Sequence, residues 1–144
     1  MSSAAQPFIS FTARCFCQAT EDEERVLEAF KAIVGDVKHE REETRGFHGN
    51  RILVFSFKTQ GSRHLKRIAE ILYGLRDELA EEMETRLDEE RVFHVRFSKQ
   101  SAFLGEVCLA RSKEGGVVDL SLKVKSHPAR WDIALKALEE WMLG

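Results

Sequence analysis

The chain has 144 residues, 43% of them hydrophobic and 32% charged, which is typical of one soluble domain and too apolar for a disordered chain. It lacks the run of about 18 apolar residues that a membrane helix needs. Its first residues, MSSAAQPF, lack the basic start and apolar middle of a signal peptide. We therefore expect a single domain over residues 1–144 that acts in the cytoplasm and does not enter a membrane.

The net charge of -2 conceals an uneven distribution of charge along the chain. Acidic residues crowd into residues 21–24, 40–43 and 77–90. Residues 91–130, in contrast, contain eight Lys and Arg against three Asp and Glu, a local charge of +5. A protein with such separated charges can present a basic surface to an anionic partner although its total charge is slightly negative.

The first predicted element is a strand over residues 8–18, FISFTARCFCQ, in which apolar and polar side chains alternate. The helix expected next carries apolar residues at helical spacing, begins at a Thr20–Glu23 capping box and stops at Gly35. In the strand, the alternation places Ile9, Phe11, Ala13, Cys15 and Cys17 toward the core and Ser10, Thr12, Arg14 and Phe16 toward the outside.

Two strands and a long helical region are predicted after that helix. Residues 36–46 are polar and weakly alternating, as expected of an exposed edge strand, and residues 51–59 are apolar on both faces, as expected of a more central one. The loop between them, Gly46–Asn50, has the glycine and asparagine that unusual backbone angles require. Residues 63–87 carry an apolar stripe at helical spacing that is broken near Gly74.

The last part of the chain predicts three strands and a helix. Strands are expected at residues 91–98, about 104–111 and 117–125. The turn-forming residues 113–116 join the last two, so that the three strands form an antiparallel meander. A helix follows Pro128. This order predicts an α+β fold, in which helices cover one face of a single-layer antiparallel or mixed β-sheet and leave the other face partly open to water.

Catalytic and metal-binding motifs are missing from the sequence. The three cysteines, Cys15, Cys17 and Cys108, form no CxxC pair, which favours reduced thiols in the core over a disulfide or a zinc site. There is no phosphate-binding loop, dinucleotide-binding glycine pattern, nucleophile elbow or HExxH motif. Acid–base catalysis by His48 in the glycine loop would need a second titrating group at a fixed spacing, and none is found. We therefore expect no catalytic residue, no metal ion and no cofactor.

The face of the sheet opposite the helices is the candidate binding surface. Its outward positions interleave cations with an aromatic ring, an arrangement that can meet a phosphate backbone and stacked bases. The same arrangement also occurs on an ordinary solvated sheet face, and the pattern alone does not separate these two interpretations. The outward residues are Arg14, Phe16, Lys58, His94, Arg96, Lys123 and Lys125.

Four stretches carry a resemblance to a known family: ATEDEERVLEAF, GFHGN, RLDEE and SKQSAFLGE. In their order and approximate spacing, the chain resembles over nearly its whole length an archaeal family of RNA-binding proteins that are also described as predicted exosome subunits. This resemblance implies RNA binding and an association with RNA processing, RNA degradation or ribosomal RNA. It also implies a fold similar to that of the ribosomal protein that binds five-S ribosomal RNA. It brings no set of catalytic residues.

The polar stretch SKQS, which follows the strand at residues 91–98, has two interpretations. In the structural one, Lys99 and Gln100 satisfy backbone groups where two strands separate. Arg86 would then pair with Asp88 or a neighbouring acid. In the functional one, Lys99 and Gln100 contact RNA. We favour a divided role, with Arg86 and Asp88 structural and the other two in contact with RNA. The candidate RNA-binding residues are then Arg14, His94, Arg96, Lys99, Gln100, Lys123 and Lys125, with His48 and Asn50 as further candidates in the glycine loop.

The sequence thus supports a non-catalytic RNA-binding protein, whose partners are RNA and protein components of an RNA-processing assembly. The alternative is a protein-interaction adaptor that docks onto an RNA-processing or ribosomal assembly without touching RNA. A nuclease that uses His48 is a third hypothesis. A gel-shift experiment with structured and single-stranded RNA at low salt separates the first two.

Overall fold

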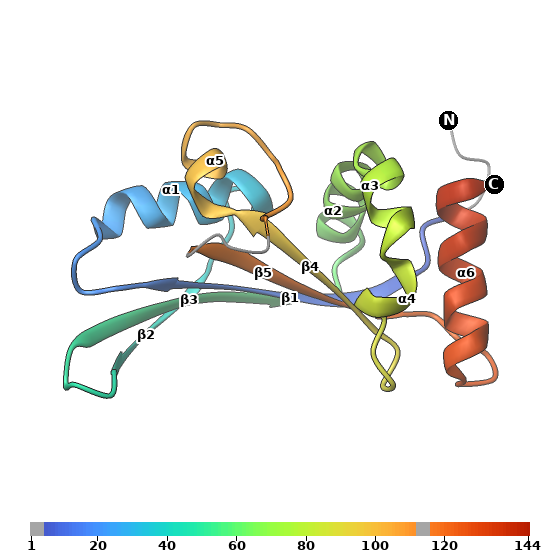
Figure 1. Cartoon of the computed structure of the whole chain (residues 1–144), viewed down its shortest axis with the longest axis horizontal. Coiled ribbons are helices and arrows are strands. Elements are labelled where there is room, and N and C mark those ends of the chain that lie inside the picture. Colours follow the sequence, from blue (N-terminus) through green and yellow to red (C-terminus); the bar gives the residue numbers. More distant parts are fainter. Residues whose placement is uncertain (1–4, 112–115) are drawn as a thin grey trace. The chain divides into compact units, whose positions relative to one another are not determined.

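The computed structural model of the protein describes residues 5–111 and 116–144. Within these residues, five strands form one antiparallel sheet in the order β2-β3-β1-β5-β4, accompanied by six helices (Figure 1). The elements are β1 (Phe8–Cys17), α1 (Glu23–Val34), β2 (Glu40–Arg45), β3 (Arg51–Thr59), α2 (Ser62–Gly74), α3 (Arg76–Glu81), α4 (Met83–Arg86), β4 (Val92–Ser98), α5 (Lys99–Phe103), β5 (Val117–Val124) and α6 (Trp131–Leu143). This arrangement confirms the predicted α+β fold with helices packed on a single sheet.

The chain forms two compact units, and the strands β1, β4 and β5 contribute residues to both. Unit 1 consists of Met1–Phe11, Thr59–His94 and Ser121–Gly144, and unit 2 consists of Thr12–Lys58 and Val95–Leu120. The helices α1 and α5 belong to unit 2, and the helices α2, α3, α4 and α6 belong to unit 1. The single-domain prediction therefore requires that the two units unfold together.

We expect the two units to unfold in one cooperative transition. The physical reason is continuity: β1, β4 and β5 each run through both units, so melting one unit disrupts strands on which the other depends. In differential scanning calorimetry, the calorimetric and van't Hoff enthalpies of unfolding should therefore agree. Two separate transitions would contradict the single-domain prediction.

In unit 2, α1 and α5 pack on one face of the strands (Figure 1). The α1 helix follows the N-cap Asp22 and ends at Gly35, whose φ of 90° and N–H bond to the Lys31 carbonyl (2.8 Å) confirm the predicted stop. Phe30 of this helix lies against Phe55 of β3, with 6.4 Å between the ring centroids. The strand β2 pairs antiparallel with β3, and all six of its residues are exposed, as predicted for an edge strand.

In unit 1, Phe8 of β1 lies in an aromatic core. Its ring is 5.3 Å from the Trp141 ring of α6 in an edge-to-face arrangement, and 6.4 Å from the Phe93 ring of β4. Trp131 donates its indole N–H to the Leu87 carbonyl at 3.0 Å. This bond ties the first residue of α6 to the residue that follows α4.

The long helical region predicted over residues 63–87 is confirmed, and it consists of three pieces. The first piece, α2, ends at Gly74, where the break was predicted, and Glu82 separates α3 from α4. Among residues 5–111 and 116–144, no helix is long and apolar enough to cross a membrane.

Two predictions near the start of the chain are wrong. The cap of α1 is Asp22 and not Thr20, because the Asp22 carboxylate accepts the Glu24 N–H at 3.0 Å directly before the first helical turn. Ile9 was expected in the core and is 41% exposed, whereas Phe8 is 1% exposed. The alternation of buried and exposed residues therefore slips by one position at the beginning of β1.

The prediction of a strand over residues 104–111 is also wrong. The prediction of a three-stranded antiparallel meander is wrong for the same reason. The chain leaves β4 directly into the short helix α5, because the Ser98 hydroxyl oxygen accepts the Ser101 N–H at 3.1 Å and caps the helix. Only an isolated bridge between Phe97 and Leu109 remains of the expected pairing in the described residues. The turn predicted at residues 113–116 lies, apart from its last residue, outside the described residues.

The three cysteines are all free thiols, as predicted. Cys15 and Cys17 are buried on the core side of β1, and burial raises the pKa of the Cys15 thiol to about 12, which keeps it protonated and unreactive. Cys108 is exposed, so the expectation that it lies in the core is wrong. It belongs to the irregular segment that replaces the predicted strand.

Candidate nucleic-acid interface

In unit 2, Arg14 and Arg96 face outward from the strands, as predicted. Arg14 is exposed and has no ion-pair partner among residues 5–111 and 116–144. Arg96 pairs through Nε with Asp119 Oδ1 of β5 at 3.2 Å, while 70% of its side chain stays exposed. Lys58, near the end of β3, is exposed as well. These cations can meet an anion without disrupting a buried contact.

In unit 1, a hydrogen-bonded chain of side chains holds His94 of β4. His94 Nε2 lies 2.8 Å from Asp88 Oδ2, and His94 Nδ1 lies 3.3 Å from Ser121 Oγ of β5. Asp88 Oδ1 also accepts the backbone N–H groups of Glu90 and Val92, at 2.9 and 3.0 Å. Partial burial acts to raise the pKa of Asp88, but the bonds from His94 and these two amides outweigh it and lower the pKa. The result is an oriented imidazole ring that is 49% exposed.

Lys123 and Lys125 are the two candidate lysines of unit 1. The alternation along β5 buries Leu122 and Val124, and it leaves both lysines exposed, as predicted. Neither lysine has an ion-pair partner in the part of the chain that the structure describes. Both ammonium groups are therefore available to an anion from solution.

Lys99 does not belong to the exposed surface. Its Nζ donates to the Phe16 carbonyl at 2.9 Å and pairs with Glu21 at 2.9 Å, and only 12% of the side chain is exposed. Glu21 also accepts the Gln18 N–H at 3.0 Å. These contacts support the structural interpretation of Lys99. Gln100 is exposed, and its contact with RNA stays a prediction.

Arg86 has the structural role that the sequence predicted. Its Nη2 pairs with Glu82 at 3.1 Å, four residues earlier in the chain, and its Nη1 donates to the His94 carbonyl at 3.3 Å. The partner is the neighbouring acid and not Asp88, because the Asp88 carboxylate binds His94. Arg86 thus links the end of α4 to the backbone of β4.

The glycine loop forms a tight turn between β2 and β3. The Gly46 N–H donates to the Asn50 carbonyl at 2.8 Å, and the Gly49 N–H donates to the Gly46 carbonyl at 2.9 Å. Gly49 has a φ of 78°, which is the unusual angle that the sequence predicted for this loop. The side chains of Phe47, His48 and Asn50 are all exposed. The loop therefore presents its side chains to solvent from a fixed backbone.

Residues 10–125 match a protein family described as RNA binding. The chain belongs to this family. An RNA-binding protein of Pyrococcus abyssi is 38% identical to it over an alignment of 142 residues, which covers 91% of each chain. A solved DUF54 protein from Methanothermobacter thermautotrophicus is similar with a TM-score of 0.78 and 29% identity, over 94% of this chain and 98% of that one. The crystal structure of a protein from Archaeoglobus fulgidus is similar with a TM-score of 0.79 and 25% identity, over 93% of this chain and 99% of that one.

These similarities confirm the predicted resemblance to archaeal RNA-binding proteins. The segment that matches the RNA binding family runs from β1 to the residue after β5. It therefore contains all nine candidate RNA-binding residues, whereas α6 lies beyond it. The match locates the family's common region on the sheet and the first five helices, and it does not rank the candidates among themselves.

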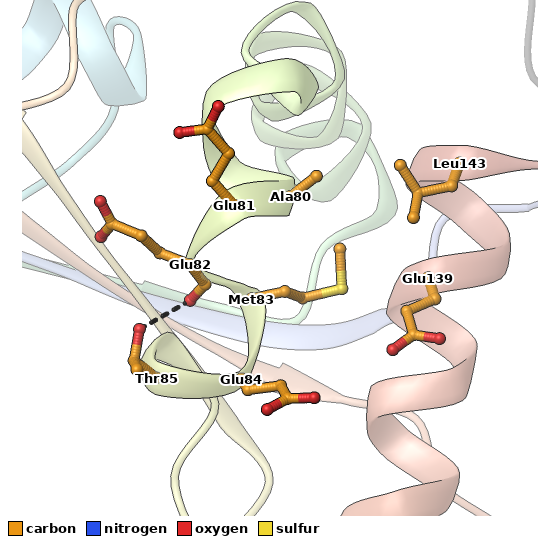
Figure 2. A pocket seen from close by; sticks show the side chains of 8 residues that line it. All are labelled: Ala80, Glu81, Glu82, Met83, Glu84, Thr85, Glu139 and Leu143. Carbon is orange, nitrogen blue, oxygen red and sulfur yellow. Dashed lines mark hydrogen bonds between the residues drawn. The ribbon is translucent and has the colours of Figure 1, made fainter.

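Unit 1 has an acidic surface pocket of about 300 Å³. None of the nine candidate residues lines it. Figure 2 shows Glu81, Glu82 and Glu84 on one side of the pocket and Glu139 of α6 on the other. Carboxylates repel phosphate groups, so this pocket does not suit an RNA backbone. Among residues 5–111 and 116–144, no three His, Cys, Asp or Glu side chains are grouped to hold a metal ion.

Proposed function

We propose that this protein binds RNA without catalysing a reaction on it. The observation that carries the proposal is membership of the RNA binding family over residues 10–125. The 38% identity to a Pyrococcus abyssi protein named as RNA-binding supports it. The exposed cations in each unit support it as well, because Lys and Arg contacts to phosphate supply much of the affinity for nucleic acids.

The proposed contacts divide into phosphate contacts and oriented donors. Lys123 and Lys125 in unit 1 and Arg14 in unit 2 are free to pair with phosphates, which positions the RNA without reading its sequence. Both ring nitrogens of His94 have partners within the fold, so His94 meets RNA through its exposed ring. Arg96 is held through Nε by Asp119, so its remaining guanidinium N–H groups lose less freedom when they donate hydrogen bonds to RNA. Such preset donors suit a phosphate oxygen or a base edge.

The linked side chains of Asp88, His94 and Ser121 contain the groups of a hydrolase triad, but their geometry favours a positioning role. Ser121 Oγ lies 3.3 Å from His94 Nδ1, but none of the three residues lines the pocket described above in unit 1, where a substrate could be held. Asp88 Oδ1 is occupied by the two backbone amides of the turn before β4. We therefore assign the three residues to holding the imidazole in place.

We also propose that the RNA belongs to an RNA-processing or ribosomal assembly. The support is the resemblance to a family that is also described as predicted exosome subunits. The alternative is an adaptor that contacts proteins of such an assembly and no RNA. Affinity purification from a cell extract, with and without nuclease treatment, distinguishes them: partners lost with the RNA support the proposal. Partners that survive nuclease treatment, without any RNA shift in vitro, support the adaptor.

The affinity for RNA should depend strongly on salt. If about three or four phosphates of a single strand are neutralised, log K should fall against the logarithm of the salt concentration with a slope of roughly -2 to -3. Gel-shift titrations with single-stranded and structured RNA over a range of salt concentrations measure this slope. An affinity that does not change with salt would reject the cationic contacts.

A further inference from the structure

We propose that Phe47, at the tip of the β2–β3 hairpin, is a stacking platform for an unpaired base of single-stranded RNA. This inference rests on the proposed function and deepens it. It assigns a contact to a residue that is not among the nine candidates, which sequence reasoning had passed over in favour of its polar neighbours His48 and Asn50.

The Phe47 side chain is 99% exposed. It is the most exposed of the large apolar side chains in the described part of the chain, and Leu104, the next, is 70% exposed. A ring that is fully in water contributes no packing to the core, and it gains most when a second flat surface covers it. Phe47 therefore offers an unoccupied aromatic face.

The backbone beneath the ring is fixed by three hydrogen bonds. Two are the amide bonds of Gly46 and Gly49 that close the loop, at 2.8 and 2.9 Å. In the third, the Arg45 guanidinium donates to the Gly49 carbonyl at 3.0 Å. Because the loop is closed in this way, its backbone is already ordered when a base stacks on Phe47, and binding costs little backbone freedom.

The surroundings favour a nucleobase over an apolar protein surface. The centroids of the His48 and Phe47 rings lie 5.1 Å apart at an interplanar angle of 89°, so the imidazole brings hydrogen-bonding nitrogens beside the phenyl ring. Residues 44–51, TRGFHGNR, contain two arginines and no acid. The carboxylate of Glu43, the residue before this segment, lies 3.7 Å from the Arg51 guanidinium, which offsets its repulsion of the phosphates beside a stacked base. The adjoining strand β2, EREETR, has no apolar residue with which Phe47 could form the apolar core of a protein interface.

Fluorescence anisotropy with labelled oligouridylate and oligoadenylate tests this inference on the full chain. Phe47→Ala should weaken binding by about 5- to 150-fold, the loss that corresponds to one stacked base. Phe47→Trp should bind as tightly as the wild type, whereas Phe47→Leu, which keeps apolar bulk without a flat ring, should bind nearly as weakly as the alanine variant. Stacking releases no counterions, so the salt slope of Phe47→Ala should equal that of the wild type.

Leu104→Ala is the matched control, because it removes another exposed apolar side chain of unit 2 and should bind RNA like the wild type. Wild-type affinity in Phe47→Ala would overturn the stacking inference and leave the proposed function intact. An equal loss of affinity in Leu104→Ala would overturn it too, because the effect would then not be specific to the aromatic ring. Failure of the wild type to bind either RNA would overturn both proposals.

Discussion

Replacing Lys99 with alanine is expected to lower the free energy of unfolding by about 1–3 kcal/mol and to leave the RNA affinity of the folded protein unchanged. The substitution removes the donor of the Phe16 carbonyl and the cation beside Glu21, at a site where the lysine side chain is only 12% exposed. Urea denaturation followed by circular dichroism gives the free energy of unfolding of both proteins. RNA affinity is measured on the same preparations.

The loss of stability in Lys99→Ala should depend on pH. Burial acts to raise the pKa of Glu21, but the bonds from the Gln18 N–H and from Lys99 lower it overall below its ordinary value of 4.5. A carboxyl whose pKa is lowered by folding stabilises the fold above its unfolded-state pKa, and this stabilisation is lost as the pH falls through the folded-state pKa. The difference between the two proteins should therefore be complete at neutral pH and shrink once the pH falls below 4.5.

Lys38→Ala is the matched control for this prediction. Lys38 lies in the same unit and is exposed, so its removal should change the free energy of unfolding by no more than about 0.5 kcal/mol. A Lys99→Ala protein as stable as the wild type, with clearly weakened RNA binding, would contradict the structural role. It would restore the interpretation in which Lys99 contacts RNA.

The double substitution Lys123→Ala/Lys125→Ala is expected to weaken binding of single-stranded RNA by about tenfold at low salt. It should also make the salt slope less negative by about 1.4, because each phosphate contact on a single strand contributes about 0.7. Both side chains are exposed and without an ion pair among the described residues, so the variant should unfold like the wild type. Fluorescence anisotropy at several salt concentrations measures both quantities.

The control for the double substitution is Lys38→Ala/Lys136→Ala, which removes two exposed lysines from outside the proposed surface. In both double variants the net charge of -2 becomes -4, since each loses two positive charges. The control should retain the affinity and the salt slope of the wild type. If it loses as much affinity as Lys123→Ala/Lys125→Ala, the effect comes from total charge, and these two lysines do not form a specific contact.

The strands could be predicted where one face of the sheet is buried, because a period of two in the sequence translates directly into buried and exposed side chains. This held for Leu122 and Lys123 on β5 and for Cys15 on β1. It failed at Ile9, because a slip of one position at the start of β1 exchanges the two faces, and no residue type there marks the slip.

The segment after β4 could not be predicted from periodicity, because a single cap decides its structure. Ser98 was interpreted as part of a polar interruption between two strands, whereas its side chain starts the helix α5. The role of Lys99 depends on Glu21, which is 78 residues away in the sequence, and no local spacing reports such a contact. The exposure of Phe47 likewise follows from the closed loop and not from the aromatic residue type.

The proposed RNA-binding surface is tested most directly by an NMR titration of the isotopically labelled protein with single-stranded RNA. We expect the amide resonances that shift to concentrate, within each unit, at the outward strand positions around Arg14, His94 and Lys123. Shifts are also expected at the hairpin tip around Phe47. Resonances that shift instead around the acidic pocket at Glu84, or that do not shift at all in excess RNA, would contradict the account.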